Sequence, residues 1–257
     1  MHQTKQFMFE TVNILGVDIA VTTLERTADR VRQWIADRKK VYLCFAPVST
    51  LVDCRDNENY RQIVNGAALV NPDGVPVVWV ARAKGKKDMQ RTGGPDFMAL
   101  TLKESTSEGP RHFFYGGNET TKDRLLKMVQ QRWPQAVVAG AIAPPFRQSG
   151  EMEDPSVIDE INAASPDILW VGLGSPKQDV WMANHRNQLT CPVICGVGAA
   201  FDFIAGTKPM APNWMRSNGL EWLFRLGCEP RRLWRRYLIG NCKFIYYLLT
   251  TEMQSHG

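Results

Sequence analysis

The stretch SPDILWVGLGSPKQDVW, residues 165–181, indicates the fold of this chain most directly. Its apolar run ILWV is typical of a buried strand, and glycines follow at Gly172 and Gly174. Pro176 then precedes a helical pattern, as prolines commonly do in the first turn of a helix. A buried strand that passes through a glycine turn into a helix is the repeating unit of α/β proteins with parallel sheets.

The same order of strand, turn and helix recurs on both sides of this stretch. Apolar runs that predict strands lie at 12–21 (broken by Gly16), 41–47, 67–74, 111–117, 136–146 and 191–198. Helical patterns lie at 23–40, from about Thr50 to Asn65, and at 75–87, 120–133 and 156–165. We therefore predict an α/β fold, a modified Rossmann-like parallel sheet flanked by helices, with ligands bound at the carboxyl ends of the strands.

The C-terminal segment differs in character from the rest of the chain. The net charge of the 257 residues is +5, and much of the positive charge lies in this segment, at Arg225, Arg231, Arg232, Arg235, Arg236 and Lys243. Interleaved tryptophans and tyrosines suit a membrane interface, and clustered cations suit phosphates or an anionic membrane surface. We predict a catalytic domain at 1–207 and, at 208–257, a helical appendage that packs on it and associates with the membrane. Two or three short helices, separated near Gly227 and Pro230, are expected there.

The composition and the apolar runs of the chain also indicate its cellular compartment. The six cysteines form no CxxC pair, so we expect buried thiols in a reducing environment. The first ten residues lack the apolar core of a signal peptide, and no uninterrupted apolar run reaches the roughly 18 residues of a spanning helix. We expect a cytoplasmic protein that is peripheral on the inner face of the cell membrane.

Three turns after predicted strands carry candidate site residues. Asp73 lies in a Pro-Asp-Gly turn and suits a general base that accepts a proton from a hydroxyl, although Asp-Gly is also an ordinary turn dipeptide. Gly116 and Gly117 allow backbone amides to approach a phosphate, or form a plain β–α turn. Near Gly174, Lys177 is suited to binding a phosphate, and Gln178 to binding a sugar hydroxyl or the edge of a base. The alternative, an ordinary helix cap, explains the glycines and the proline of this stretch but not the lysine and glutamine together.

Cations of the appendage are candidates for binding phosphate. Arg225, Arg232 and Arg235 are spaced by seven and three residues, which places them on similar faces if the helix continues through Pro230. The alternatives are a solvated basic face or a patch that holds anionic lipid. The four histidines are scattered, at His2, His112, His185 and His256, and no DxD motif appears, so we predict neither a metal nor a cofactor.

Several stretches, taken together, resemble the WecG/TagA/CpsF glycosyltransferases, glycosyltransferase family 26. They are NPDGVPVVW (71–79), RTGGPD (91–96), FFYGG (113–117), residues 165–181, GVGAAFDFIAG (196–206) and GLEWLFRLGCEPRRLWRRY (219–237). The resemblance implies a nucleotide-binding α/β fold and inverting transfer from a UDP-sugar to a polyprenyl-diphosphate-linked sugar in bacterial surface polysaccharide synthesis. It also implies that no metal is needed and that the appendage helps to close the active site at the membrane.

The resemblance assigns roles to individual residues. Asp73 matches the family's proposed base, Gln178 the glutamine of its Pro-Lys-Gln-Glu motif, and Arg225, Arg232 and Arg235 the arginines thought to bind the donor diphosphate. Arg91 and Asp202, which lie in two of the matching stretches, are expected to bind substrate. This chain has Phe45-Ala46-Pro47 where the family often has Thr-x-Asn, and Met210-Ala211-Pro212 where it has Arg-Ala-Pro. The first departure leaves the identity of the sugar open.

Two other functions compete with glycosyl transfer. A Rossmann-type NAD-dependent oxidoreductase requires a glycine fingerprint with an acid about 20 residues on, and the first βα connection has one glycine. A non-catalytic basic module would bind either a membrane or RNA, and the position of the aromatics in a terminal helical segment favours the membrane. We therefore expect no nucleic-acid partner, and a homo-oligomer remains open.

Overall fold

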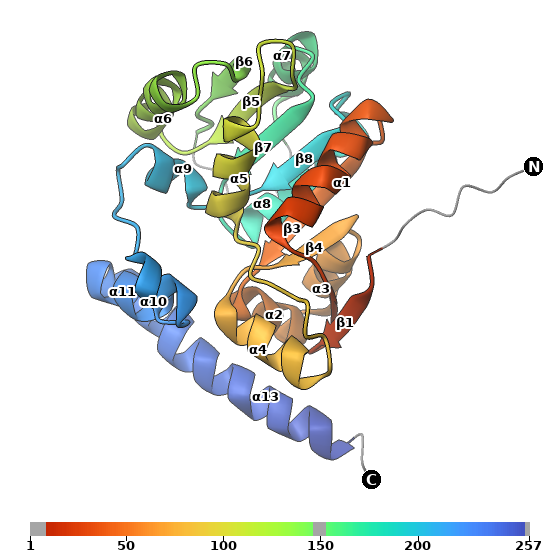
Figure 1. Ribbon diagram of the computed structural model, residues 1–257, viewed down its shortest axis with the longest axis vertical. Helices are drawn as coiled ribbons and strands as arrows, with labels where there is room; N and C mark the ends of the chain where they lie inside the picture. The colour runs from red at the N-terminus through yellow and green to blue at the C-terminus, as the bar shows by residue number, and fades with distance from the viewer. Residues whose placement is uncertain (1–8, 146–152, 255–257) are drawn as a thin grey trace, which may run out of the picture.

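The computed structural model describes residues 9–145 and 153–254, and it contains a six-stranded parallel sheet with the strand order β4-β3-β8-β7-β5-β6 (Figure 1). The strands of this sheet are β3 (Val41–Ala46), β4 (Leu69–Pro72), β5 (Arg111–Gly116), β6 (Val137–Ile142), β7 (Ile168–Gly172) and β8 (Val193–Gly196). The predicted α/β fold is confirmed. The predicted lack of a signal peptide rests on residues 1–10, and residues 1–8 lie outside the described ranges. His2, His256 and the last residue of the predicted strand at 136–146 also lie outside them.

Helices cover both faces of the sheet. On one face lie α1 (Leu24–Ala36), α5 (Gly94–Lys103), α6 (Glu119–Arg132) and α9 (Ala200–Ile204). On the other lie α2 (Val48–Asp56), α3 (Glu58–Asn65), α4 (Val75–Ala83), α7 (Pro155–Ala163) and α8 (Lys177–His185). Successive residues of each strand serve opposite faces, so Phe114 and Trp170 pack on the first layer and Tyr115 and Leu169 on the second.

Local sequence signals explain several of these boundaries. The run at 12–21 forms a hairpin of β1 (Thr11–Ile14) and β2 (Val17–Ala20). Its two-residue turn has positive φ at both Leu15 (54°) and Gly16 (88°), as a type I′ turn requires, and glycine adopts that conformation without strain. Helix α1 begins after Thr23, whose side chain accepts a hydrogen bond from the backbone N–H of Arg26.

The C-terminal segment packs on the sheet domain, as predicted. It contains α10 (Asn213–Ser217), α11 (Glu221–Cys228), α12 (Pro230–Trp234), a π-helical turn η1 (Arg235–Ile239) and α13 (Gly240–Gln254). Helix α13 runs along the bottom of the molecule in Figure 1 and packs against α2. There, Phe244 is buried, and the Lys243 ammonium lies 2.7 Å from a carboxylate oxygen of Asp56.

Three local predictions are wrong in detail. The helix expected from Thr50 to Asn65 is two helices, because Asn57 is extended and its side chain caps the second. The appendage does not consist of short helices alone, since one helix continues from Pro230 to Gln254 through η1. The cysteines are not all buried: Cys228 and Cys242 on the appendage are exposed. No helix in ranges 9–145 and 153–254 is long and apolar enough to cross a membrane.

The contrast between the exposed Cys228 and Cys242 and the four buried cysteines gives a direct test of the packing of the chain. In the folded protein, a thiol reagent should label two cysteines rapidly and leave the buried Cys44, Cys54, Cys191 and Cys195 unlabelled. Replacing Cys228 and Cys242 by serine should abolish the rapid phase. Rapid labelling of a third thiol in the native protein, measured by intact mass, would contradict the packing described above.

Candidate functional site

A cavity of about 280 Å³, here called the main cavity, lies at the carboxyl edge of the sheet. Its walls come from the ends of β3, β4, β7 and β8 on one side and from the appendage on the other. This is the edge at which parallel sheets bind their ligands. A smaller cavity of about 110 Å³, here called the side cavity, lies next to it between the starts of α2 and α4 and the appendage.

Asp73 lies in the wall that the two cavities share. It directly follows β4, and its backbone N–H donates to the carbonyl of Ala46 at 3.2 Å, which keeps the turn in register with β3. The carboxylate is therefore fixed by the end of a buried strand, and 23% of its side chain remains exposed toward the cavities. This placement agrees with the position predicted for it.

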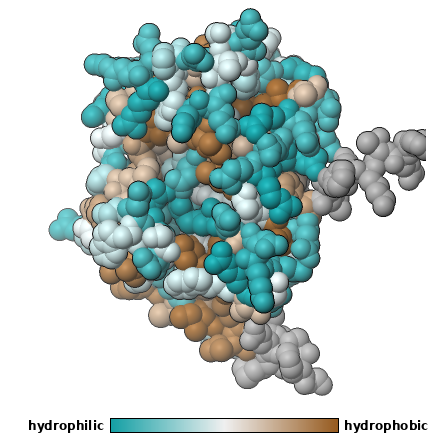
Figure 2. Space-filling view, in the orientation of Figure 1, coloured by the Kyte–Doolittle hydropathy of each residue, from teal (hydrophilic) through white to brown (hydrophobic). Residues whose placement is uncertain are grey.

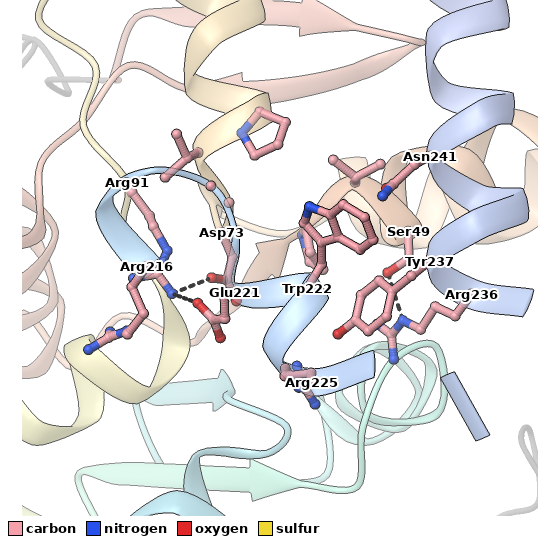
Figure 3. A pocket seen from close by; sticks show the side chains of 16 residues that line it. Ser49, Asp73, Arg91, Arg216, Glu221, Trp222, Arg225, Arg236, Tyr237 and Asn241 are labelled. Carbon is pink, nitrogen blue, oxygen red and sulfur yellow. Dashed lines mark hydrogen bonds and ion pairs between the residues drawn. The ribbon is translucent and has the colours of Figure 1, made fainter. Parts of the chain in front are cut away.

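One guanidinium holds three carboxylates at this wall. Arg91 lies with Nη2 3.5 Å from Asp73 Oδ1 and 3.0 Å from Glu221 Oε2 (Figure 3). Its Nη1 donates to Asp96 Oδ2 at 2.6 Å. Arg216 also binds Asp96. Glu221 and Arg216 belong to the appendage, whereas the other three residues belong to the sheet domain, so this network joins the two parts of the chain.

The surroundings of Asp73 raise its pKa. Burial disfavours the ionised carboxylate, and Arg91 opposes this effect, as Arg225 does more weakly. The negative charges of Glu221 and Asp96 add to the rise, and the pKa reaches about 6. A carboxylate with this pKa is ionised at neutral pH and is a stronger base than an ordinary aspartate.

Two of the three predicted arginines line the main cavity. Arg225 stacks on Phe203, with its guanidinium carbon 5.6 Å from the ring centroid. Arg232 forms a two-pronged pair with Glu229, at 2.5 Å from Nε and 2.8 Å from Nη2. Arg235 does not line the main cavity and lies instead over the ring of Trp234, at 5.2 Å.

The common helical face expected for Arg225, Arg232 and Arg235 is absent. Helix α11 ends before Glu229, and Pro230 starts a new helix. Arg225 and Arg232 therefore lie on two different helices, and their spacing of seven residues does not place them on one face. The neighbour of Arg235, Arg236, lines both cavities. The spacing predicted that Arg235 binds phosphate in the site, but Arg236 lines the main cavity in its place.

Gln178 lines the main cavity, but its amide already has protein partners. Its Nε2 donates to the carbonyl of Gly196 at 2.7 Å and to Ser175 Oγ at 3.3 Å, and its Oε1 accepts from the N–H of Gly174 at 3.1 Å. The side chain thus joins the loops after β7 and β8 and shapes the cavity between them. Gly174 also lines this cavity, whereas Lys177 does not.

The glycine pair after β5 has a packing role in this structure. A Cβ on Gly116 would lie 2.6 Å from the carbonyl oxygen of Gly172, so only glycine fits there. The N–H of Gly117 donates to that same carbonyl at 3.3 Å. The amide that was expected to approach a phosphate is thus engaged within the protein, and neither glycine lines the main cavity.

Asp202 and Lys208 complete the charged lining near Arg232. The Lys208 ammonium lies 3.3 Å from Asp202 Oδ2 and 3.6 Å from Glu229 Oε1. The pairing with Arg232, and also Lys208, lowers the pKa of Glu229. Asp202 additionally accepts a hydrogen bond from Thr207 at 3.0 Å, so its placement at the main cavity is fixed.

Sequence reasoning missed Glu221, Arg216, Asp96, Lys208 and Arg236. Glu221 and Asp96 lie within quoted stretches, but nothing in their spacing connects them to Asp73. The available signal was the presence of an acid at the start of the basic appendage and another in RTGGPD. Among residues 9–145 and 153–254, no group of three or more histidine, cysteine, aspartate or glutamate side chains is arranged to hold a metal ion.

The raised pKa of Asp73 predicts a cost to folding that depends on pH. The folded state binds its proton more tightly than the unfolded state, so stability falls as pH rises from about 4 to 6 and the cost persists above that. Asp73→Asn should therefore raise the free energy of unfolding at pH 7.5 by about 2 kcal/mol, allowing for the solvent access of the site. The gain should disappear near pH 4, as measured by urea unfolding.

Asp202→Asn is the matched control, because Asp202 is a carboxylate of the same cavity that is already paired with Lys208. It should give no gain at pH 7.5. A loss of stability in Asp73→Asn at pH 7.5 would mean that the attraction of Arg91 outweighs the desolvation of the carboxylate.

Comparisons with known proteins identify the family of this chain. A protein of Bacillus spizizenii named N-acetylglucosaminyldiphosphoundecaprenol N-acetyl-beta-D-mannosaminyltransferase is 29% identical over 222 residues, which cover 86% of this chain and 84% of the relative. A Staphylococcus aureus protein of the same name is 27% identical over 229 residues, 87% of each chain. The profile of the family described as "Glycosyl transferase WecG/TagA/CpsF family" matches residues 12–257. The chain therefore belongs to this family and is a glycosyltransferase.

Proposed function

We propose that this enzyme transfers a sugar from a UDP-sugar to a polyprenyl-diphosphate-linked sugar, with inversion and without a metal ion. The observation that carries the proposal is that Asp73, a carboxylate of raised pKa, lines both cavities together with Arg225 and Arg236 of the appendage. The names of the relatives support the acceptor, since both state an N-acetylglucosaminyl-diphosphoundecaprenol substrate.

The reaction is a single displacement. The acceptor hydroxyl oxygen attacks the anomeric carbon of the donor, its proton passes to Asp73, and the bond between that carbon and the UDP oxygen breaks. Positioned acid–base catalysis of this kind contributes roughly 10²–10⁴-fold. Because the oxygen attacks from the face opposite UDP, the configuration at the anomeric carbon inverts.

The leaving diphosphate is stabilised by Arg225 and Arg232 in the main cavity, with Lys208 beside them. Arg232 now holds the Glu229 carboxylate in the two-pronged geometry that also suits a phosphate. Binding of the donor therefore requires an exchange in which a diphosphate oxygen replaces Glu229. Since cations and not a bound metal would neutralise the charge that develops, activity should persist in a chelator.

The sugar subsite differs from the pattern of the family at Phe45. This side chain lines the main cavity and packs on Phe97, with ring centroids 5.5 Å apart. A phenyl ring cannot donate a hydrogen bond to a sugar hydroxyl, so selectivity at this position depends on shape. The donor sugar is best identified with a panel of UDP-sugars.

The appendage gives the enzyme an apolar surface suited to a lipid-linked substrate. Figure 2 shows hydrophobic residues gathered at the bottom of the molecule, where Figure 1 places α13. The large exposed apolar side chains described between Pro230 and Thr250 are Trp234, Leu238, Ile239, Ile245, Tyr246 and Leu249. Together with Arg231 and Arg235 they support peripheral binding to the inner face of an anionic membrane.

The proposal is tested with purified protein, a panel of UDP-sugars and a short-chain polyprenyl-diphosphate sugar. Asp73→Asn and Arg232→Ala should each lower turnover by about two orders of magnitude. The wild-type rate should be unchanged by EDTA, and UDP should raise the melting temperature where NAD and RNA do not. Near-normal turnover of Asp73→Asn would remove Asp73 as the base.

The pH dependence of the rate provides a second test. Since Asp73 must be ionised to accept the proton, kcat/KM should fall tenfold per pH unit below about pH 6. Glu221→Gln removes a negative charge that raises the pKa of Asp73, so the fall should begin at lower pH in this variant. A matched charge removal at Asp56, which pairs with Lys243 on the outside of the domain, should leave the profile unchanged. An identical profile in Glu221→Gln would show that Asp73 does not set the acidic limb.

A further inference from the structure

The side cavity has a composition of its own. It is lined by the starts of α2 and α4, by α11, and by Arg236, Tyr237 and Asn241 of the long C-terminal helix (Figure 3). Its charged lining consists of four arginines, Arg91, Arg216, Arg225 and Arg236, against two carboxylates, Asp73 and Glu221. The lining thus has an excess of positive charge, which suits an anionic ligand.

Two of these arginines are free to bind such a ligand. Arg91 and Arg216 already hold Asp96, and Arg91 also holds Glu221. Arg225 stacks on Phe203 and Arg236 donates to the neutral hydroxyl of Ser49 at 2.9 Å. Neither of these last two forms an ion pair with a carboxylate in the part of the chain that the structure describes. Arg225 also lines the main cavity, where it is assigned to the donor, so the unpaired guanidinium fork of Arg236 is the one left for phosphate oxygens in the side cavity.

Helix α2 and helix α4 add partial positive charge to the same space. Both are nine residues long, both begin at the side cavity, and neither has a side chain that caps its N-terminus. Their first N–H groups lack intrahelical partners, and the N-terminus of a helix favours negative charge. This supports the charge argument made from the arginines.

The rim of the side cavity is apolar on the side of the appendage. Trp222 and Tyr237 belong to its lining, and a Cβ on the lining residue Gly219 would lie 3.2 Å from the ring of Trp79. Trp79 has 55% of its surface exposed. A lipid chain attached to a diphosphate in this cavity would leave past the exposed ring of Trp79, whereas UDP needs no such exit.

We infer that the side cavity binds the diphosphate of the lipid-linked acceptor, with Arg236 as its anchor. The inference rests on the proposed function and assigns the donor to the main cavity. Asp73 lies in the wall between the two cavities, so it is positioned where an acceptor hydroxyl from one side would meet a donor carbon from the other. Ser49 holds the guanidinium of Arg236 at the start of α2.

Arg235 and Arg236 form a matched pair for the test. They are adjacent and carry the same charge, but only Arg236 lines the cavities, while Arg235 stacks on Trp234. Binding of geranyl diphosphate is measured by calorimetry on protein saturated with UDP, in uncharged detergent. Arg236→Ala should weaken this binding at least about tenfold, the loss of roughly 1.4 kcal/mol, and Arg235→Ala less than about twofold. UDP affinity should be unchanged in Arg235→Ala, and in Arg236→Ala, whose side chain also lines the main cavity, it should fall less than the affinity for geranyl diphosphate.

The variant Arg236→Lys and the melting temperature of each variant distinguish a loss of binding from a loss of folding. Lysine retains the charge but loses the fork, so an intermediate loss is expected while UDP binding reports an intact fold. Competition between geranyl diphosphate and UDP, equal losses in the two alanine variants, or an unchanged affinity in Arg236→Ala would each overturn the inference. Failure of the proposed function is distinct, because it would appear as an absence of sugar transfer even where geranyl diphosphate binds as described.

Discussion

The arrangement of the site depends on the sharing of one guanidinium, that of Arg91, among three carboxylates. Asp73 and Asp96 come from the sheet domain and Glu221 from the appendage, so a single cation offsets negative charge from both parts of the chain. Without Arg91 the three acids would repel one another at close range in a partly buried place. Its presence allows the appendage to bring the Glu221 carboxylate close to Asp73, and this second negative charge raises the pKa of Asp73 while Arg91 itself lowers it.

Burial gives Asp73 its properties at some cost to folding. A carboxylate that is partly removed from water and flanked by acids disfavours ionisation, and proteins tolerate such groups mainly at functional sites. Contacts within the protein also hold the edge of the sheet around the cavity. Gln178 joins the loops after β7 and β8, and the Gly116 backbone packs directly on Gly172.

The appendage supplies the charges that the sheet domain lacks at this edge. Arg225, Arg232 and Arg236 all come from it, as do the exposed tryptophans and aliphatic side chains that suit a membrane. Docking of α13 on α2, through buried Phe244 and the pair of Lys243 with Asp56, places these groups over the cavities. One segment thus carries both an exposed apolar surface and the arginines that line the cavities, and the proposed lipid-linked substrate requires both features.

The sequence by itself determined the layers of the fold and the edge of the sheet at which the cavities lie. Alternation of apolar strands with helical patterns gave the parallel sheet, because burial follows a period of two in strands and 3.6 in helices, and the glycine turns marked its carboxyl end. Only the tertiary structure decided which side chains meet. Arg91 and Glu221 are 130 positions apart, and no periodicity connects them. The break at Glu229 changed the phase between Arg225 and Arg232, and Arg236 rather than Arg235 lines the cavities. The partners of Gln178 and of the Gly117 amide were likewise set by neighbouring strands, because a hydrogen bond depends on distance and direction in space.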